Sequence, residues 1–202
     1  MGNDLTNNGK CQVLGITGNN NNIFITGFFF QNPIKLGGKT SAVPTQNDIF
    51  IASIDSNLIS APWLTAHGDV GSRKEYGTGI TVNGNDLYVC GYSDNISFTV
   101  LASGTNYTIP NAGKNAPWLL KCSTVNGNVA WATAGVSFKG NSAALDVAAD
   151  ANNVYITGFY SDSTKFVTTP SKTGPFTYTA PLLSNGGSDI FVAKYNNNGI
   201  LQ

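Results

Sequence analysis

The sequence predicts an all-β fold built from tandem β-propeller blades, and three observations support that prediction. A pattern of β-favouring residues that ends in glycine recurs three times, at intervals of 64 and 67 residues. Turns rich in Asn, Asp and Gly separate the predicted strands and suit tight hairpins. No segment has the apolar spacing of a long amphipathic helix. Units of four short strands, repeated in tandem, are typical of a propeller.

The clearest repeated element is a strand that ends in a glycine followed by an aromatic residue. Each copy opens with a polar pair and continues with four β-favouring residues before the glycine. The three copies are 21–28, 85–92 and 152–159, with Gly27, Gly91 and Gly158 near their ends. A further strand precedes each copy, at 13–16, 79–82 and 145–148. We therefore expect three equivalent hairpins.

Two more strands complete the first two predicted units, and the third unit has the first of these two strands. The third strand covers 48–53, 116–121 and 189–194. The fourth strand carries Trp63 or Trp131, each 15 residues after the start of the third. This ungapped agreement between two motifs indicates internal repetition. We expect one repeat domain over 1–202, with repeats of about 65 residues at approximately 1–62, 63–130 and 131–202.

The residues resemble one known repeat family. Residues 186–199 (Gly-Gly-Ser-Asp-Ile-Phe-Val-Ala-Lys-Tyr-Asn-Asn-Asn-Gly) and the three copies of the glycine-ending strand are similar to SBBP repeats, a family named for seven-bladed β-propellers. Residues 166–170 (Phe-Val-Thr-Thr-Pro) resemble the loop between those strands. The resemblance covers nearly the whole chain and is strongest in the third repeat. It implies propeller blades on secreted, surface-exposed or virus-encoded proteins, and it implies no common catalytic residues.

Three blades are too few for a closed ring, because propellers generally have about four to eight. In register with the other copies, the next Trp-bearing strand would begin just beyond Gln202. The predicted array therefore has open edges, and open edges pair with partners. Two explanations stand: the chain is part of a longer propeller, or several copies assemble by packing blade against blade.

Charge and composition exclude several classes of partner. Lys plus Arg and Asp plus Glu number 11 each, so the net charge is zero. No basic stripe is present, and we expect no nucleic-acid partner. No apolar run is long enough to cross a bilayer, so we expect no membrane span. Solubility rests on Asn, Ser and Thr rather than on charge, which favours association with other copies.

The chain offers few groups for catalysis or metal binding. His67 is the only histidine, the three cysteines are widely spaced, and Glu75 is the only glutamate. A zinc site would have no ligand set, and no Gly-x-Ser-x-Gly segment could supply a nucleophile. We expect His67 to be a strand-end or loop residue and Glu75 to lie in a solvated charged loop. Cys90 is expected to be a small buried thiol. We predict no catalytic residue, cofactor or metal.

Several aspartates recur near predicted turns. Asp48 and Asp189 occupy equivalent positions, and Asp146 and Asp150 flank a hairpin with Asn152. Side chains of this kind commonly accept hydrogen bonds from turn N–H groups. Calcium ligation is the alternative, although no calcium loop with a bidentate glutamate is present. Paired carboxylates of a glycoside hydrolase remain a third interpretation, but no spacing singles out a pair.

The long connections between the second and third strands hold the aromatic candidates for binding. Long ordered loops on a rigid scaffold often carry recognition, and aromatic rings there stack on sugars or anchor proteins. The alternative is that they cover the outer edges of the blades. The candidate residues are Phe29, Phe30, Phe98, Tyr107, Phe166, Phe176 and Tyr178.

These observations favour a non-catalytic propeller module for protein–protein contact or structural assembly, at a cell surface or on a virus particle. Its expected partners are other proteins or other copies of the chain. A carbohydrate-binding propeller is the alternative, and glycans would then be the ligands. A propeller hydrolase is the third hypothesis, and it would need acids that converge at the ring axis.

Overall fold

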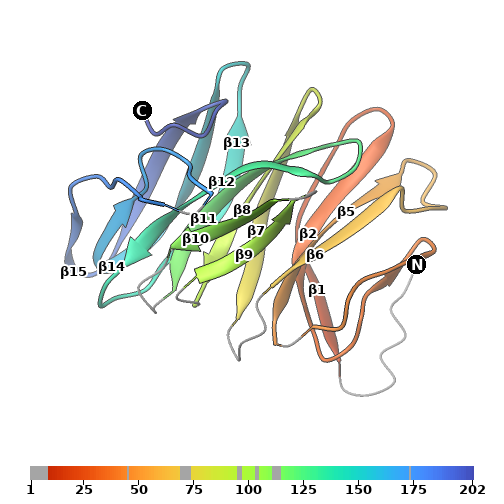
Figure 1. The fold of residues 1–202 in the computed structure, drawn as a ribbon, viewed down its shortest axis with the longest axis horizontal. Coiled ribbons are helices and arrows are strands. Elements are labelled where there is room, and N and C mark those ends of the chain that lie inside the picture. Colours follow the sequence, from red (N-terminus) through yellow and green to blue (C-terminus); the bar gives the residue numbers. More distant parts are fainter. Residues whose placement is uncertain are drawn as a thin grey trace.

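The computed structural model describes residues 9–44, 46–68, 74–94, 97–102, 105–110, 115–172 and 174–202. Fifteen strands and no helix are formed in these ranges, so the all-β prediction is confirmed. Within the same ranges, no helix is long and apolar enough to cross a membrane. Figure 1 shows the strands side by side along the longest axis, with β1 and β2 toward one end and β14 and β15 toward the other.

The first group of strands forms a four-stranded antiparallel sheet, which we call unit 1. Its order is β1-β2-β5-β6, which is also the order along the chain. A small hairpin, β3 and β4, lies in the connection between β2 and β5. The bounds are β1 (Lys10–Gly18), β2 (Asn22–Phe30), β3 (Lys35–Leu36), β4 (Lys39–Thr40), β5 (Asp48–Asp55) and β6 (Trp63–His67).

The second group, unit 2, repeats this connectivity. Its strands β7, β8, β11 and β12 are neighbours in that order. The hairpin of β9 and β10 again lies between the second and third strands of the unit. The bounds are β7 (Glu75–Asn83), β8 (Asp86–Ser93), β9 (Ser97–Ala102), β10 (Thr105–Pro110), β11 (Ala116–Ser123) and β12 (Val129–Ser137).

The third group, unit 3, has three strands: β13 (Ser142–Ala149), β14 (Asn153–Phe166) and β15 (Leu182–Asn196). Its β14 and β15 are 14 and 15 residues long, whereas short strands were expected. The hairpin is lengthened through a bulge between Ser161 and Ser163, where Asp162 has a φ of 62°. The far end of β14 also pairs with β12, so units 2 and 3 share one curved seven-stranded sheet that nearly closes on itself.

A β-bulge recurs at the same place in the first strand of every unit. The register shifts between Val13 and Gly15, between Gly77 and Gly79, and between Ala144 and Asp146. Each bulge lies opposite the repeated glycine of the second strand. A bulge adds one unpaired residue and increases the local twist. The same irregularity thus recurs at the spacing found in the sequence.

The repeated glycines are required by close backbone contact. A Cβ on Gly27 would lie 1.8 Å from the carbonyl oxygen of Gln12. At Gly91 and Gly158 the distances to the facing carbonyl oxygens are 1.8 and 1.9 Å. No side chain fits at such distances, so glycine alone permits this approach of the first and second strands.

The units pack face to face around a shared core. Strand β7 lies against β1, β2 and β5 of unit 1, and β13 lies against β7, β8 and β11 of unit 2. One continuous cluster of buried residues therefore runs through all three units. It includes Phe24, Ile51, Trp118, Leu119, Ile156 and Phe191.

Candidate functional site

A tryptophan joins each unit to the next. Trp63 of β6 donates its indole Nε1–H to the carbonyl oxygen of Thr124, 2.9 Å away in the turn after β11. Trp131 of β12 donates in the same way to Asn197, at 3.0 Å in the turn after β15. The fourth strand of one unit thus reaches the turn that follows the third strand of its successor, and both indole N–H groups are satisfied.

Each tryptophan ring packs against a glycine of that turn. Gly127 and Gly199 have φ values of 72° and 77°. A Cβ on Gly127 would lie 2.7 Å from the ring of Trp63, and one on Gly199 would lie 2.8 Å from that of Trp131. Glycine is therefore required at these positions both by the left-handed backbone conformation and by the close contact with the ring. We call each set of tryptophan, carbonyl and glycine a latch.

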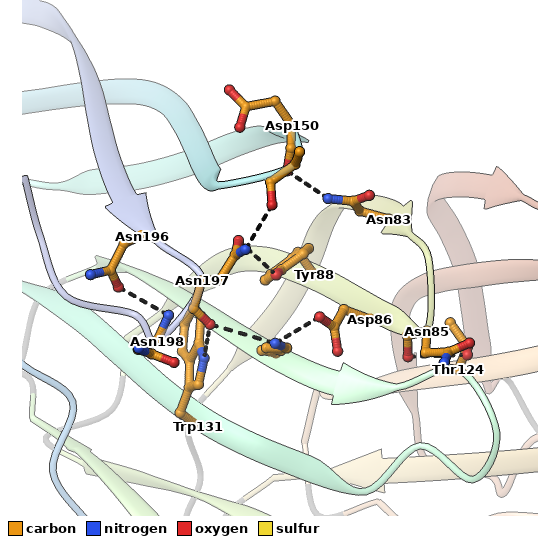
Figure 2. A network of polar contacts seen from close by, with 12 residues as sticks. Asn83, Asn85, Asp86, Tyr88, Thr124, Trp131, Asp150, Asn196, Asn197 and Asn198 are labelled. Atoms are coloured by element: carbon orange, nitrogen blue, oxygen red, sulfur yellow. Dashed lines mark hydrogen bonds and ion pairs between the residues drawn. The ribbon is translucent and has the colours of Figure 1, made fainter.

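Figure 2 shows the polar groups around the second latch. Asn197 is its centre, because its carbonyl oxygen accepts from Trp131 while its Nδ2 donates to the carbonyl oxygen of Ala151 at 2.9 Å. Lys121 forms an ion pair of 2.7 Å with Asp86 and lies 5.7 Å from the ring centroid of Tyr88. The Asp86 side chain is 40% exposed, so this pair adds little stability and mainly orients Lys121.

The face that unit 2 presents to unit 3 is buried. Tyr88, Cys90 and Leu119 have no exposed surface on this side. Their counterparts in unit 1, Phe24, Thr26 and Ile51, are equally buried against unit 2. In units 1 and 2, the face of the second and third strands that points toward the following unit is therefore buried.

In unit 3 the same face is uncovered. Val192 is the counterpart of Leu119 and is 71% exposed, and Ile190, the counterpart of Pro117, is 84% exposed. Thr157, which corresponds to Cys90, is exposed as well. We call this surface of β14 and β15 the open face. Single exposed apolar residues are common on protein surfaces, but the positions of Ile190 and Val192 are buried in both unit 1 and unit 2.

The opposite face of the array is closed by the chain itself. In units 2 and 3, one face of the second and third strands contacts the preceding unit. The residues at the corresponding positions of unit 1 are Ile25, Phe50 and Ala52. They are covered by Ile34 and Leu36 from the connection between β2 and β5, and Ile34 is 4% exposed. Unit 1 thus completes its own small core, whereas unit 3 does not cover its outer face.

The predicted aromatic candidates fall into separate environments. Phe29 and Phe166 are buried, with their ring centroids 6.4 Å from Phe50 and 5.0 Å from Phe191. Phe30 and Phe176 are half-buried, and Tyr178 is 40% exposed. The backbones of Phe98 and Tyr107 lie in β9 and β10, but their side chains are outside the described part of the structure. The burial of Phe29 and Phe166 favours the covering role.

The only histidine is enclosed. His67 ends β6 and is 2% exposed. Burial lowers its pKa from 6.5 to about 4, because a low-dielectric environment disfavours the imidazolium. A neutral, enclosed imidazole is poorly placed for proton exchange with a substrate in solvent.

Two of the aspartates near predicted turns accept backbone hydrogen bonds. Asp150 accepts hydrogen bonds from the backbone of Asn152 and Asn153, both at 2.8 Å, and from the Tyr155 hydroxyl at 2.9 Å. The backbone N–H of Asn152 contributes most to the lowered pKa of this carboxyl, followed by the hydroxyl of Tyr155. Asp189 accepts from the N–H of Asn185 at 2.7 Å. Asp150 therefore has the predicted role of a turn acceptor, whereas Asp189 accepts from an N–H within β15.

The prediction of a solvated loop at Glu75 is wrong. Glu75 begins β7 and has no exposed surface, and its N–H donates to the carbonyl oxygen of Asn47 at 2.7 Å. The reason is that β7 packs against unit 1, which carries its first residue into the interior. Cys90 is buried as expected, and burial raises the pKa of its thiol to about 12.

An aromatic row was missed by the sequence reasoning. Phe28 and Tyr76 have ring centroids 4.9 Å apart in an edge-on arrangement, and Tyr76 stacks on Tyr92 at 4.7 Å. Asn47 donates to the Tyr76 hydroxyl at 2.7 Å. The signal was available, because Phe28 and Tyr92 are the aromatic residues that follow the repeated glycine. The row spans units 1 and 2, and its rings are half-buried.

In the described ranges, no three His, Cys, Asp or Glu residues lie close enough together to hold a metal ion. Comparison with known proteins adds no assignment, because no protein-family model matches the chain and no curated protein is similar to it.

Proposed function

We propose that this chain is a non-catalytic β-propeller-type module that acts through protein–protein contact or structural assembly, at a cell surface or on a virus particle. The open face of unit 3 is the observation that carries this proposal. Its residues Ile190 and Val192 are exposed where the corresponding residues of units 1 and 2 are buried. Burial of such aliphatic side chains is worth about 1.5–3 kcal/mol each, so a partner that covers them gains affinity.

The organisation of the units supports the propeller interpretation. Units 1 and 2 are four-stranded meanders whose strand order follows the chain, and each unit packs against the next. The bulges, the close-packed glycines and the tryptophan latches recur in equivalent positions. Propeller blades are built from this kind of unit.

The titratable groups support a role without catalysis. His67 is enclosed and neutral, while Asp150 and Asp189 accept hydrogen bonds from backbone N–H groups. Catalytic acids and bases must reach the proton that they transfer. A panel of glycosidase and esterase substrates is expected to show no turnover, and turnover that copurifies with the protein would contradict the proposal.

Assembly can be tested by measuring the molar mass in solution over a range of concentrations. In the absence of another partner, the open face can only bury itself against a second copy. The wild-type mass should rise from 21.2 kDa toward twice that value, while the double variant Ile190→Lys/Val192→Lys should remain at 21.2 kDa. At a concentration at which both chains are monomeric they should have the same melting temperature, since the substituted side chains are exposed there. Identical monomers at every concentration would contradict the proposal.

Carbohydrate binding is the second candidate, and the aromatic row is the observation that favours it. Tyr76, Tyr92 and Phe28 present half-buried rings beside the amide of Asn47. Rings next to planar polar groups are suited to stacking on sugars and bonding their hydroxyls. A glycan array should then give signals that the Tyr92→Ala variant loses and the Tyr155→Ala variant keeps. Signals that are equal in both variants would exclude this row.

A further inference from the structure

We infer that the open face, together with the free outer edge of β15, is the docking site for one further unit of the same repeat, which enters with a strand of the pattern Trp-x-Thr-Ala. This inference rests on the proposed function and names its partner. The pattern comes from the chain itself, where residues 63–66 and 131–134 read Trp-Leu-Thr-Ala and Trp-Ala-Thr-Ala.

The outer edge of β15 is prepared for such a strand. In units 1 and 2 the third strand is paired on this side by the strand that carries the tryptophan. In unit 3 only the start of that pairing is present: Leu201 forms a bridge with Tyr195, and the N–H of Gln202 donates to Lys194. Toward Ile190, no other strand of the described ranges pairs with this edge. Unpaired N–H and C=O groups of an edge strand can recruit a further strand.

The register of an incoming strand is fixed by comparison with unit 2. There Val129 pairs with Cys122, and Trp131 pairs with Lys121. Leu201 opposite Tyr195 repeats the first of these pairs. A tryptophan one position after Gln202 would consequently lie opposite Lys194, as Trp131 lies opposite Lys121.

A hollow follows the same edge. It has a volume of about 250 Å³, and Ala193 and Lys194 of β15 line one side of it. Leu201 and Gln202 also line it, and Phe166 and Leu182 contribute apolar surface. Space along a strand edge with apolar lining is what a further strand requires.

A second copy of the chain cannot dock on the open face head to tail, although two open faces can still pack against each other. To dock as unit 3 docks on unit 2, a copy would have to offer the face that carries Ile25 and Phe50 in unit 1. That face is already covered by Ile34. The corresponding faces of units 2 and 3 are buried against their neighbours. Docking of the kind seen between units 2 and 3 therefore requires a further unit with its own uncovered face.

The faces already used in this chain define the chemistry of the partner. Unit 2 presents Leu87, Val89 and Leu120 to unit 1, and unit 3 presents Val154, Ile156 and Ala193 to unit 2. The partner sheet should accordingly carry aliphatic side chains on its second and third strands. It should also have a glycine turn that accepts the ring and the N–H of the tryptophan.

The test is an extended chain in which a copy of residues 131–202 follows Gln202. This supplies a Trp-Ala-Thr-Ala strand and one complete further set of strands. Hydrogen exchange of the Val192 and Lys194 amides should slow about tenfold or more relative to the 202-residue chain. A matched extension in which the copied tryptophan is alanine should lose much of this protection.

The double substitution Ile190→Lys/Val192→Lys serves as the matched control. It should leave the melting temperature of the 202-residue chain unchanged and lower that of the extended chain by about 5 °C or more, because the lysines would then be buried. Unchanged exchange at β15 together with an unfolded extension would overturn the inference. In that case the proposed function would still stand if self-association of the 202-residue chain depended on Ile190 and Val192.

Discussion

Substitution of the repeated glycine of unit 2 tests the structural basis of the repeat. In Gly91→Ala the added Cβ would lie 1.8 Å from the carbonyl oxygen of Tyr76 and 2.5 Å from the ring of Trp118. Both contacts are far inside van der Waals separation, and the first is with backbone. Strands β7 and β8 must therefore move apart at the centre of the core. Overpacking of this kind typically lowers the free energy of unfolding by about 1–3 kcal/mol. We expect a loss of about 3 kcal/mol, because a backbone carbonyl in a paired strand cannot move away as a flexible side chain can.

Urea unfolding followed by tryptophan fluorescence gives the free energy of unfolding, and a loss of about 3 kcal/mol would be a large part of a typical total of about 5–15 kcal/mol. Gly84→Ala is the matched control, because its Cβ would meet nothing within 4 Å and only its φ of 60° opposes the change. That variant should lose about 1 kcal/mol. Equal losses in the two variants would refute the close-contact explanation. Gly27→Ala and Gly158→Ala should resemble Gly91→Ala if the units are equivalent.

Three further predictions concern single side chains. Trp131→Phe removes the N–H that bonds Asn197, and it should cost about 1–2 kcal/mol in urea unfolding, whereas Tyr178→Phe at an exposed site should cost almost nothing. The pKa of His67 is about 4 in the folded protein and 6.5 in the unfolded chain, so the neutral imidazole makes its full contribution to the free energy of unfolding above pH 6.5. That contribution, about 3 kcal/mol, is lost as the pH falls toward 4. In His67→Gln this part of the pH dependence of stability should vanish, and an unchanged pH profile would contradict the prediction. The Cys90 thiol, with a pKa raised to about 12 and no exposed surface, should resist alkylation until the protein unfolds, while the half-buried Cys11 should react first in a mass-spectrometric time course.

Much of the strand order could be predicted from local pattern. The glycine-ending strands, the third strands and the two tryptophans were all identifiable because each repeats at nearly constant spacing. The turns were also predictable, since Gly127 and Gly199 adopt the positive φ that their Asn-Gly context favours. Repetition made these features visible because independent copies carry the same constraint.

The features that could not be predicted depend on contacts between distant segments. Ile34 reads as part of a polar connection, yet it covers the core of unit 1. Glu75 reads as a surface charge, yet packing of β7 on unit 1 encloses it. The extension of β14 past Ser161 arises from its pairing with both β12 and β15. Local periodicity carries no information on which face a distant loop will cover.

The difference between the two ends of the array decides which form of assembly is compatible with the fold. A ring or fibre of identical chains joined head to tail requires the outer face of unit 1 to receive the open face of unit 3. Ile34 occupies that position, and Leu58, whose φ of 60° places it where the latch turns have glycine, would set a side chain in the path of an incoming tryptophan. Head-to-tail closure would need both obstacles to be displaced. In the described part of the chain, the outer face of unit 1 is therefore blocked for head-to-tail assembly, while the corresponding face of unit 3 is exposed.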